Sequence, residues 1–239
     1  MIKQKKLSIL SLKTFILFIL TFFLIILYFY FSFFFEINNV SKAYITNQGD
    51  NTVSIIDLET LKTLKTLKVG VAPLGITILQ EKKLVFVGNV GTDDISVIDA
   101  VNDTLIKTIK LGTAPLSLAS NSEETKVYVT DWFQNNVLTI SADEMKVTRR
   151  LKVGVTPSGI AYNKKYKYQV ITNRDANTLE IYNEHDDLVK KIETGNHPFG
   201  VYSEGDFAYV ANVYDDSVSI INLVDWSKYE FMVGAHPYN

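Results

Sequence analysis

The feature that most constrains this chain is an internal repeat of about 40 residues. Each of the five prolines closes a Gly-x-x-Pro unit, and from Pro73 to Pro237 these prolines are spaced by 42, 42, 41 and 39 residues. A second motif, first seen as YITN at Tyr44 to Asn47, also recurs five times, and its last position steps by 42, 42, 42 and 39 residues. Two separate markers that stay in phase over five copies indicate a tandem array.

Each repeat has the pattern of four short strands. Apolar and polar residues alternate in runs of about five, separated by turn residues. In the second repeat, strand one is Leu74 to Ile78, strand two ends at Asn89, and strand three is Ile95 to Asp99 after an acidic turn. Strand four runs into the next Gly-x-x-Pro unit. Four strands in about 40 residues are typical of a propeller blade, so we predict an all-β fold: a β-propeller of five four-stranded repeats over residues 43–239.

The glycines and prolines of the repeat have mechanical roles. The connection from the outer strand of one blade to the inner strand of the next changes direction, and we expect the glycine of Gly-x-x-Pro to permit this through a positive φ. A second glycine, two residues after the proline in three repeats, falls on the inner strand (Gly75, Gly159 and Gly200). Blades converge there, so we expect larger side chains to clash.

The repeat resembles the YVTN-type β-propeller repeat. The resemblance covers residues 43–237 and rests on Tyr44 to Asn47, Tyr128 to Asp131, Asn51 to Asp57 and Lys152 to Ala161. Similar repeats occur in surface-layer propellers and, more distantly, in the propeller subunit of quinone-dependent amine dehydrogenases and in haem-binding nitrite reductases. The resemblance implies a fold rather than an activity.

The repeat number departs from this family, whose members are commonly seven-bladed. Here there are five repeats, and the first begins at strand two. The sequence leaves three interpretations open: a truncated product, a five-bladed ring with one three-stranded blade, or an open arc. An open arc would expose strand edges that favour self-association.

The N-terminal segment predicts a membrane anchor. Thr14 to Phe35 contains 22 residues and no charge, and as a helix it would span about 33 Å, against about 30 Å for a bilayer core. Four lysines precede it, which predicts a cytoplasmic location for residues 1–13 and an extracytoplasmic location for the linker 36–42 and the propeller. Aromatic residues end the segment where a signal peptidase site would need small ones, which favours an uncleaved anchor.

Composition excludes several classes of function. The chain has no cysteine, which excludes disulfides, thiolate metal sites and cysteine nucleophiles. Beyond residue 35 there are 26 acidic and 24 − 4 = 20 basic residues, a net charge near −6. This charge disfavours nucleic acid as a partner. No catalytic or cofactor-binding motif occurs, so we predict no enzyme activity and no cofactor.

Candidate binding residues are those that differ between repeats on the face formed by the Gly-x-x-Pro connections and by the turns between strands two and three. Two of these residues are histidines, His197 and His236. Each precedes a proline, where the other repeats have Ala72, Ala114 and Thr156. Two histidines suggest a metal or haem site, but spacing implies no third ligand, and we predict no metal. The candidates are Trp132, Phe133, Arg174, His197, Tyr214 and His236.

The predicted function is a membrane-anchored, cell-surface propeller that binds a protein, glycan or envelope component without catalysis. The first alternative is an accessory subunit of a redox system, of the amine dehydrogenase or haem-binding kind. The second is a remnant without independent function.

Overall fold

The computed structural model describes residues 15–30, which form a helix, and residues 41–238, which form β-sheets. The helix belongs to one compact unit, and residues 44–56 and 63–238 belong to another. Within the described residues, no helix has both the length and the apolar character needed to cross a bilayer. The predicted anchor at 14–35 extends past the helix, because residues 14 and 31–35 lie outside the described part of the chain. The predicted cytoplasmic segment 1–13 and residues 36–40 of the linker lie outside it as well.

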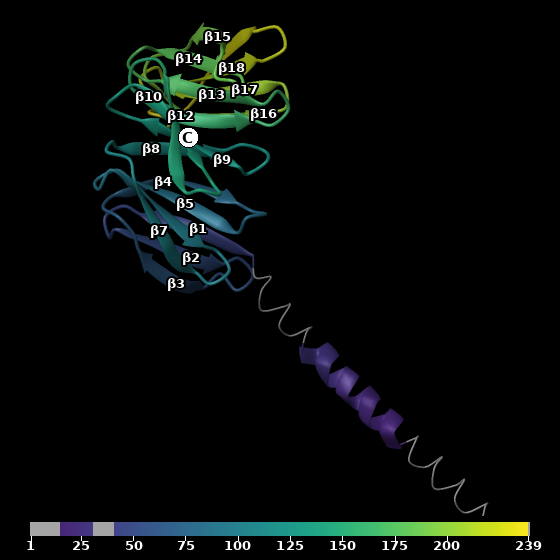
Figure 1. Ribbon diagram of the computed structural model, residues 1–239. Coiled ribbons are helices and arrows are strands. Elements are labelled where there is room, and N and C mark those ends of the chain that lie inside the picture. Colours follow the sequence, from purple (N-terminus) through teal and green to yellow (C-terminus); the bar gives the residue numbers. More distant parts are fainter. Residues whose placement is uncertain (1–14, 31–40, 239) are drawn as a thin grey trace, which may run out of the picture. The chain divides into compact units, whose positions relative to one another are not determined.

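Five antiparallel sheets follow one another along the chain (Figure 1). The first has three strands, β1 (Lys42–Asn47), β2 (Thr52–Asp57) and β3 (Thr63–Lys68). The second contains β4 (Pro73–Leu79), β5 (Leu84–Asn89), β6 (Asp94–Asp99) and β7 (Thr104–Lys110). The third contains β8 (Pro115–Ser120), β9 (Lys126–Asp131), β10 (Asn136–Ser141) and β11 (Lys146–Lys152). The fourth contains β12 (Pro157–Asn163), β13 (Tyr168–Asn173), β14 (Thr178–Tyr182) and β15 (Leu188–Glu193). The fifth contains β16 (Pro198–Glu204), β17 (Phe207–Asn212), β18 (Ser217–Asn222) and β19 (Lys228–Met232).

The sheets are arranged as an open arc. Every four-stranded sheet starts at the proline of its repeat, and the inner strands β4, β8, β12 and β16 pack beside one another in that order. Figure 1 shows the sheets in chain order from β1–β3 to β16–β19. The predicted repeats are therefore confirmed, and they form an open arc rather than a closed five-bladed ring.

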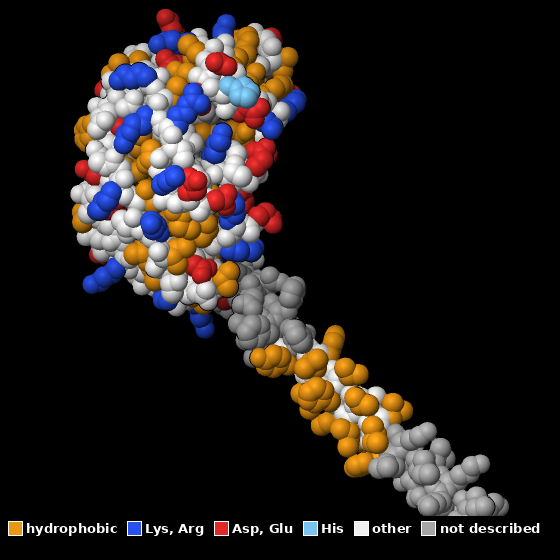
Figure 2. All heavy atoms as spheres, in the orientation of Figure 1, with side chains coloured by type: hydrophobic (Ala, Val, Ile, Leu, Met, Phe, Trp, Pro, Cys, Tyr) orange, Lys and Arg blue, Asp and Glu red, His pale blue; other side chains and the backbone are white. Residues whose placement is uncertain are grey.

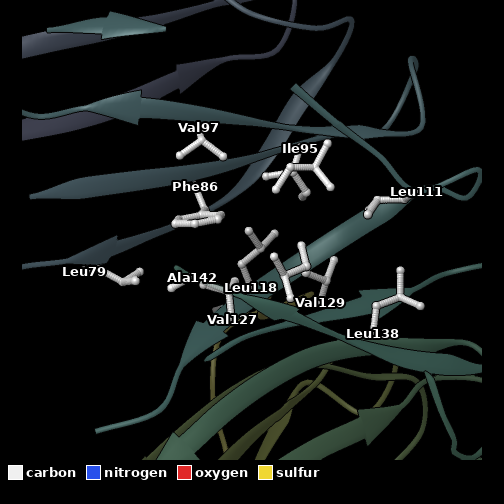
Figure 3. Close-up of a cluster of buried hydrophobic side chains, with 12 residues drawn as sticks. Leu79, Phe86, Ile95, Val97, Leu111, Leu118, Val127, Val129, Leu138 and Ala142 are labelled. Atoms are coloured by element: carbon white, nitrogen blue, oxygen red, sulfur yellow. The ribbon is translucent and has the colours of Figure 1, made fainter. Parts of the chain in front are cut away.

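The hydrophobic core lies between consecutive sheets. Because strand residues alternate, each sheet has a forward face toward the following sheet and a rear face toward the preceding one. Between the second and third sheets, Phe86 and Ile95 from the forward face meet Val129 and Leu138 from the rear face, all fully buried (Figure 3). Similar clusters fill the other three junctions. Burying each such side chain contributes roughly 1.5–3 kcal/mol, so these layers stabilise the arc.

The Asn that ends the second strand has a structural role. In the first repeat the side-chain amide of Asn47 donates to Thr52 Oγ1 at 2.9 Å and to Ser54 Oγ at 2.8 Å. In the fifth repeat Asn212 donates to Ser217 and Ser219 at 3.0 and 2.9 Å. These bonds tie the second strand to the third across the hairpin, and they account for the polar residue that closes the repeated motif.

Two expectations about glycine have different outcomes. On the inner strands, a Cβ on Gly75 would lie 2.5 Å from the Leu116 carbonyl oxygen of the next sheet, which confirms the expected crowding. In the connections, only Gly112 has a positive φ, of 71°. The expected positive φ is wrong for Gly70, Gly154, Gly195 and Gly234. At Gly70 and Gly154 a Cβ would instead lie 2.6 Å from the Asn89 side chain and 2.5 Å from that of Asn173.

Candidate ligand-binding site on the loop face

The loop face consists of the Gly-x-x-Pro connections and of the turns between the second and third strands. Side chains in the turns hold the connections in place: the backbone N–H of His197 donates to Asn177 Oδ1 at 2.9 Å, and that of His236 donates to Asp216 Oδ1 at 2.8 Å. Asn135 holds Thr156 in the same way at 2.8 Å. The two loop types therefore form one layer, as the sequence predicts.

Both histidines occupy a special backbone position. The residue before the proline has a positive φ in four connections, 52° at Ala72, 56° at Thr156 and 53° at both His197 and His236. Histidine is among the non-glycine residues enriched in this left-handed region. The positive φ that the sequence assigned to glycine therefore lies mostly on the residue before proline.

Arg174 lies between two aromatic rings. Its guanidinium carbon is 5.7 Å from the ring centre of Trp132 and 6.0 Å from that of Tyr214. Both distances are within the range of cation–π attraction. Nη1 of Arg174 also forms an ion pair with Asp175 Oδ1 at 2.8 Å. The turns of the third, fourth and fifth sheets thus place an aromatic ring, a cation and a second aromatic ring in one row.

Tyr214 also contacts both histidines. Its ring centre is 4.2 Å from that of His197 and 6.2 Å from that of His236, the latter edge-on. Nε2 of His197 is 3.8 Å from Asp175 Oδ1, whereas Nδ1 is buried and has no hydrogen-bond partner among the described residues. Within residues 15–30 and 41–238, no group of three His, Cys, Asp or Glu side chains is placed to hold a metal.

Two further aromatic residues extend the row, and the sequence prediction missed both. The ring centre of Phe199 is 6.1 Å from Trp132 and 5.2 Å from Tyr238. Both residues directly follow a proline of the repeat, where the earlier repeats have Leu74, Leu116 and Ser158. The change to an aromatic side chain in the last two repeats is a signal that could have identified them.

Phe133 is the one predicted candidate that stays apart. Its side chain is 74% exposed, and within the described residues it has no ring contact. Its backbone N–H donates to Asp131 Oδ1 at 3.2 Å, which fixes the turn. The structure therefore brings five of the six predicted residues together, and with Phe199 and Tyr238 we call them the loop-face cluster.

Carboxylates lie at the edge of the cluster. Asp175 accepts a hydrogen bond from Thr156 Oγ1 at 2.6 Å besides its ion pair with Arg174. The Asn196 backbone N–H, and then its side-chain amide, hold the pKa of Asp215 below its ordinary value. Both acids are thus placed to accept hydrogen bonds from a ligand. Exposed rings beside a cation and acceptors suit a ligand with a flat face and a polar rim.

Five consecutive sheets of this topology and their shared loop face define a β-propeller repeat protein. A family model of YNCE-like beta-propeller proteins matches residues 32–223. The chain therefore belongs to the YNCE-like beta-propeller family, in agreement with the YVTN-type resemblance. A comparison with curated proteins finds no matching relative.

Several solved structures share the fold. A catalytically inactive histidine-to-alanine variant of virginiamycin B lyase from Staphylococcus aureus, with quinupristin, matches with a TM-score of 0.73 and 14% identity, covering 85% of this chain and 71% of that one. A functionally unknown protein from Desulfotomaculum acetoxidans matches with 0.73 and 15%, covering 82% and 68%. A streptogramin B lyase matches with 0.71 and 12%, covering 82% and 66%. At these identities the likeness concerns the fold alone.

Proposed function

We propose that this protein is a non-catalytic, surface-exposed binding module that recognises a glycan of the cell envelope through the loop-face cluster. The observation that carries the proposal is the row of Trp132, Arg174, Tyr214 and His236, assembled from three neighbouring sheets and the last connection. Tyr214 is 57% exposed, so a sugar can contact its ring. Asp175 and Asp215 at the rim supply acceptors for hydroxyl groups.

The proposal includes a membrane anchor at residues 14–35, with residues 1–13 in the cytoplasm and the propeller outside. The helix at 15–30 supports it, because it contains no charged residue and Figure 2 shows hydrophobic side chains along it. Figure 2 also shows acidic and basic side chains interspersed over the visible part of the sheets. This distribution supports the choice of a glycan over a nucleic acid, which would require a basic patch.

The test is a titration of the full chain in detergent with chitotetraose and with soluble peptidoglycan fragments. Trp132 lies in the cluster while Trp226 stacks against Tyr168, at 6.5 Å, so ligand binding should change only the fluorescence of Trp132. We expect Tyr214→Ala to weaken binding by at least about tenfold, as loss of one stacking side chain should. Phe133→Ala, an exposed aromatic outside the cluster, is the matched control. Equal affinity in both variants would contradict the proposal.

A lyase is the second candidate, because a similar structure bears that name and is inactivated by loss of a histidine. The observation that favours it is His197, whose Nε2 lies 3.8 Å from Asp175 while Nδ1 is buried without a partner. Incubation with quinupristin, followed by liquid chromatography, separates the two assignments. Turnover that disappears in His197→Ala would overturn the non-catalytic assignment. A bound chromophore that depends on both histidines would instead favour the redox-subunit alternative.

A further inference from the structure

The forward face of the fifth sheet is uncovered and aromatic. Strand pairing places Tyr202 beside Tyr209, Tyr209 beside Ile220, and Ile220 beside Tyr229, while Phe231 pairs with Val218 on the same face. The exposed aromatic side chains of this terminal face are Tyr202 (59%), Phe207 (38%), Tyr209 (37%), Tyr229 (57%) and Phe231 (54%). At the position of Tyr209, the four preceding sheets bury their residue to 8% exposure or less: Tyr44, Phe86, Tyr128 and Val170.

The terminal face also differs chemically from the four covered ones. The residue paired with the middle of the third strand is basic in every earlier sheet, as Lys65, Lys107, Arg149 and Lys190, and is Tyr229 in the fifth. On the inner strand, the residue paired with Tyr209 is Tyr202, where the earlier four-stranded sheets have Thr77, Ala119 and Ala161. In the fifth sheet, the fourth strand thus lacks a positive charge at Tyr229, and the inner strand has a large side chain at Tyr202 in place of a small one.

These replacements change what the face accepts. In the covered faces, a small side chain on the inner strand leaves room for the next inner strand, as the packing of β8 against β12 requires. Tyr202 fills that room. The rear face of another sheet therefore fits poorly. A surface rich in tyrosine and phenylalanine, by contrast, matches the composition of protein interfaces.

We propose that the terminal face binds the same face of a second copy of this chain, forming a twofold-symmetric dimer. A twofold interface is self-complementary, so one aromatic surface suffices for both partners. Tyr229 replaces a basic residue, so two copies of a net acidic domain meet through a surface depleted of charge. Glu204, at the end of the face, accepts a hydrogen bond from the Tyr202 hydroxyl at 2.5 Å.

The area of the terminal face is sufficient for a weak dimer interface. Five aromatic side chains at about half exposure offer about 500 Å² per copy. Two such faces bury about 1,000 Å², which is close to the lower limit for a specific interface. The dimer is therefore expected to be reversible, with dissociation in the micromolar range.

The first experiment measures the mass of the full chain in detergent by light scattering over a range of concentrations. The test variant combines Tyr202→Ala with Tyr229→Lys, residues that the earlier sheets already hold at these positions. The control combines Phe133→Ala with Val224→Lys, at exposed sites outside the face. We expect wild type and control to dimerise, and the test variant to dissociate at least about 30-fold more readily, as two interface aromatics should cause.

A second experiment keeps the proposal falsifiable if the variant misfolds. The chain has no cysteine, so a single cysteine introduced at Tyr209, Ile220 or Tyr229 is the only thiol that can react. A bismaleimide reagent should join two copies through at least one of these sites, and should not join them through Leu188→Cys, which is exposed elsewhere. Three outcomes would each overturn the proposal. They are a monomeric wild type, a dimer that the helix holds together and that therefore persists equally in the test variant, and cross-linking only at Leu188→Cys.

Discussion

Phe86 and Tyr209 occupy the same position of the repeat in two different sheets. Both lie on the second strand and on the forward face, yet Phe86 is fully buried and Tyr209 is 37% exposed. Local sequence is similar at the two sites, and the difference comes from the sheet that follows. Burial in a repeat array is thus set by the neighbouring unit, and the same side chain type stabilises the fold in one sheet and forms a surface in another.

The largest effect is expected for Phe86→Ala. Removing a fully buried ring leaves a cavity among Ile95, Val97 and Leu118, so the free energy of unfolding should fall by about 3–5 kcal/mol. The measurement is denaturant unfolding of the full chain in detergent, followed by tryptophan fluorescence. A loss below about 1 kcal/mol would mean that the junction between the second and third sheets is loosely packed.

An intermediate effect is expected for Gly159→Ala, which tests the crowding between inner strands. Its new Cβ would meet the Phe199 carbonyl oxygen and the Thr172 hydroxyl of adjoining strands. Overpacking of this kind costs about 1–3 kcal/mol, and the same unfolding assay measures it. Gly49→Ala is the control, because its Cβ would meet no atom within 4 Å. An equal loss of unfolding free energy at the two glycines would mean that the inner strands are no more crowded than the turns.

A smaller effect is expected for Tyr209→Ala, at the position equivalent to Phe86. Because the ring is 37% exposed, the free energy of unfolding should fall by about 1–2 kcal/mol, less than at Phe86. The assay is run at concentrations where the chain is monomeric, so that loss of an interface does not contribute. A cost matching that of Phe86→Ala would show that another part of the chain covers the terminal face.

The smallest effect is expected at Asp215, and it depends on pH. Hydrogen bonds from Asn196 lower its pKa below the ordinary value of 3.8, so the carboxylate stabilises the folded state above that value. This contribution is lost as the pH falls through the folded-state pKa. Asp215→Asn should therefore lower the urea midpoint at neutral pH, and the difference from wild type should shrink below about pH 4. A difference that stays constant with pH would exclude the carboxylate charge as its cause.

Much of this architecture could be predicted from sequence because repetition averages out local ambiguity. The strand predicted at Ile95 to Asp99 corresponds to β6 (Asp94–Asp99). Five of the six candidate site residues meet in space because they are exceptions at positions whose backbone is the same in every repeat. Phe133 does not join them, since a turn position fixes where a side chain starts and not which way it extends.

Other features could not be read from the sequence for physical reasons. The positive φ at His197 depends on how the connection is held by Asn177, which is a tertiary contact. The sequence does not decide between an open arc and a closed ring, because closure depends on whether the first and last sheets meet. The terminal face could not be predicted because its residues continue the alternation of the repeat, and their exposure depends on tertiary packing.

In four connections the residue before proline donates a hydrogen bond to a turn side chain, and this bond has a wider consequence. Asn51, Asn135, Asn177 and Asp216 accept hydrogen bonds from the backbone N–H of the residue before proline, so these bonds do not depend on the side chain of that residue. The loop face then offers, in these repeats, a fixed backbone position at which one side chain can replace another without a change in backbone conformation. Its specificity is accordingly open to change by substitution alone, at little cost to folding.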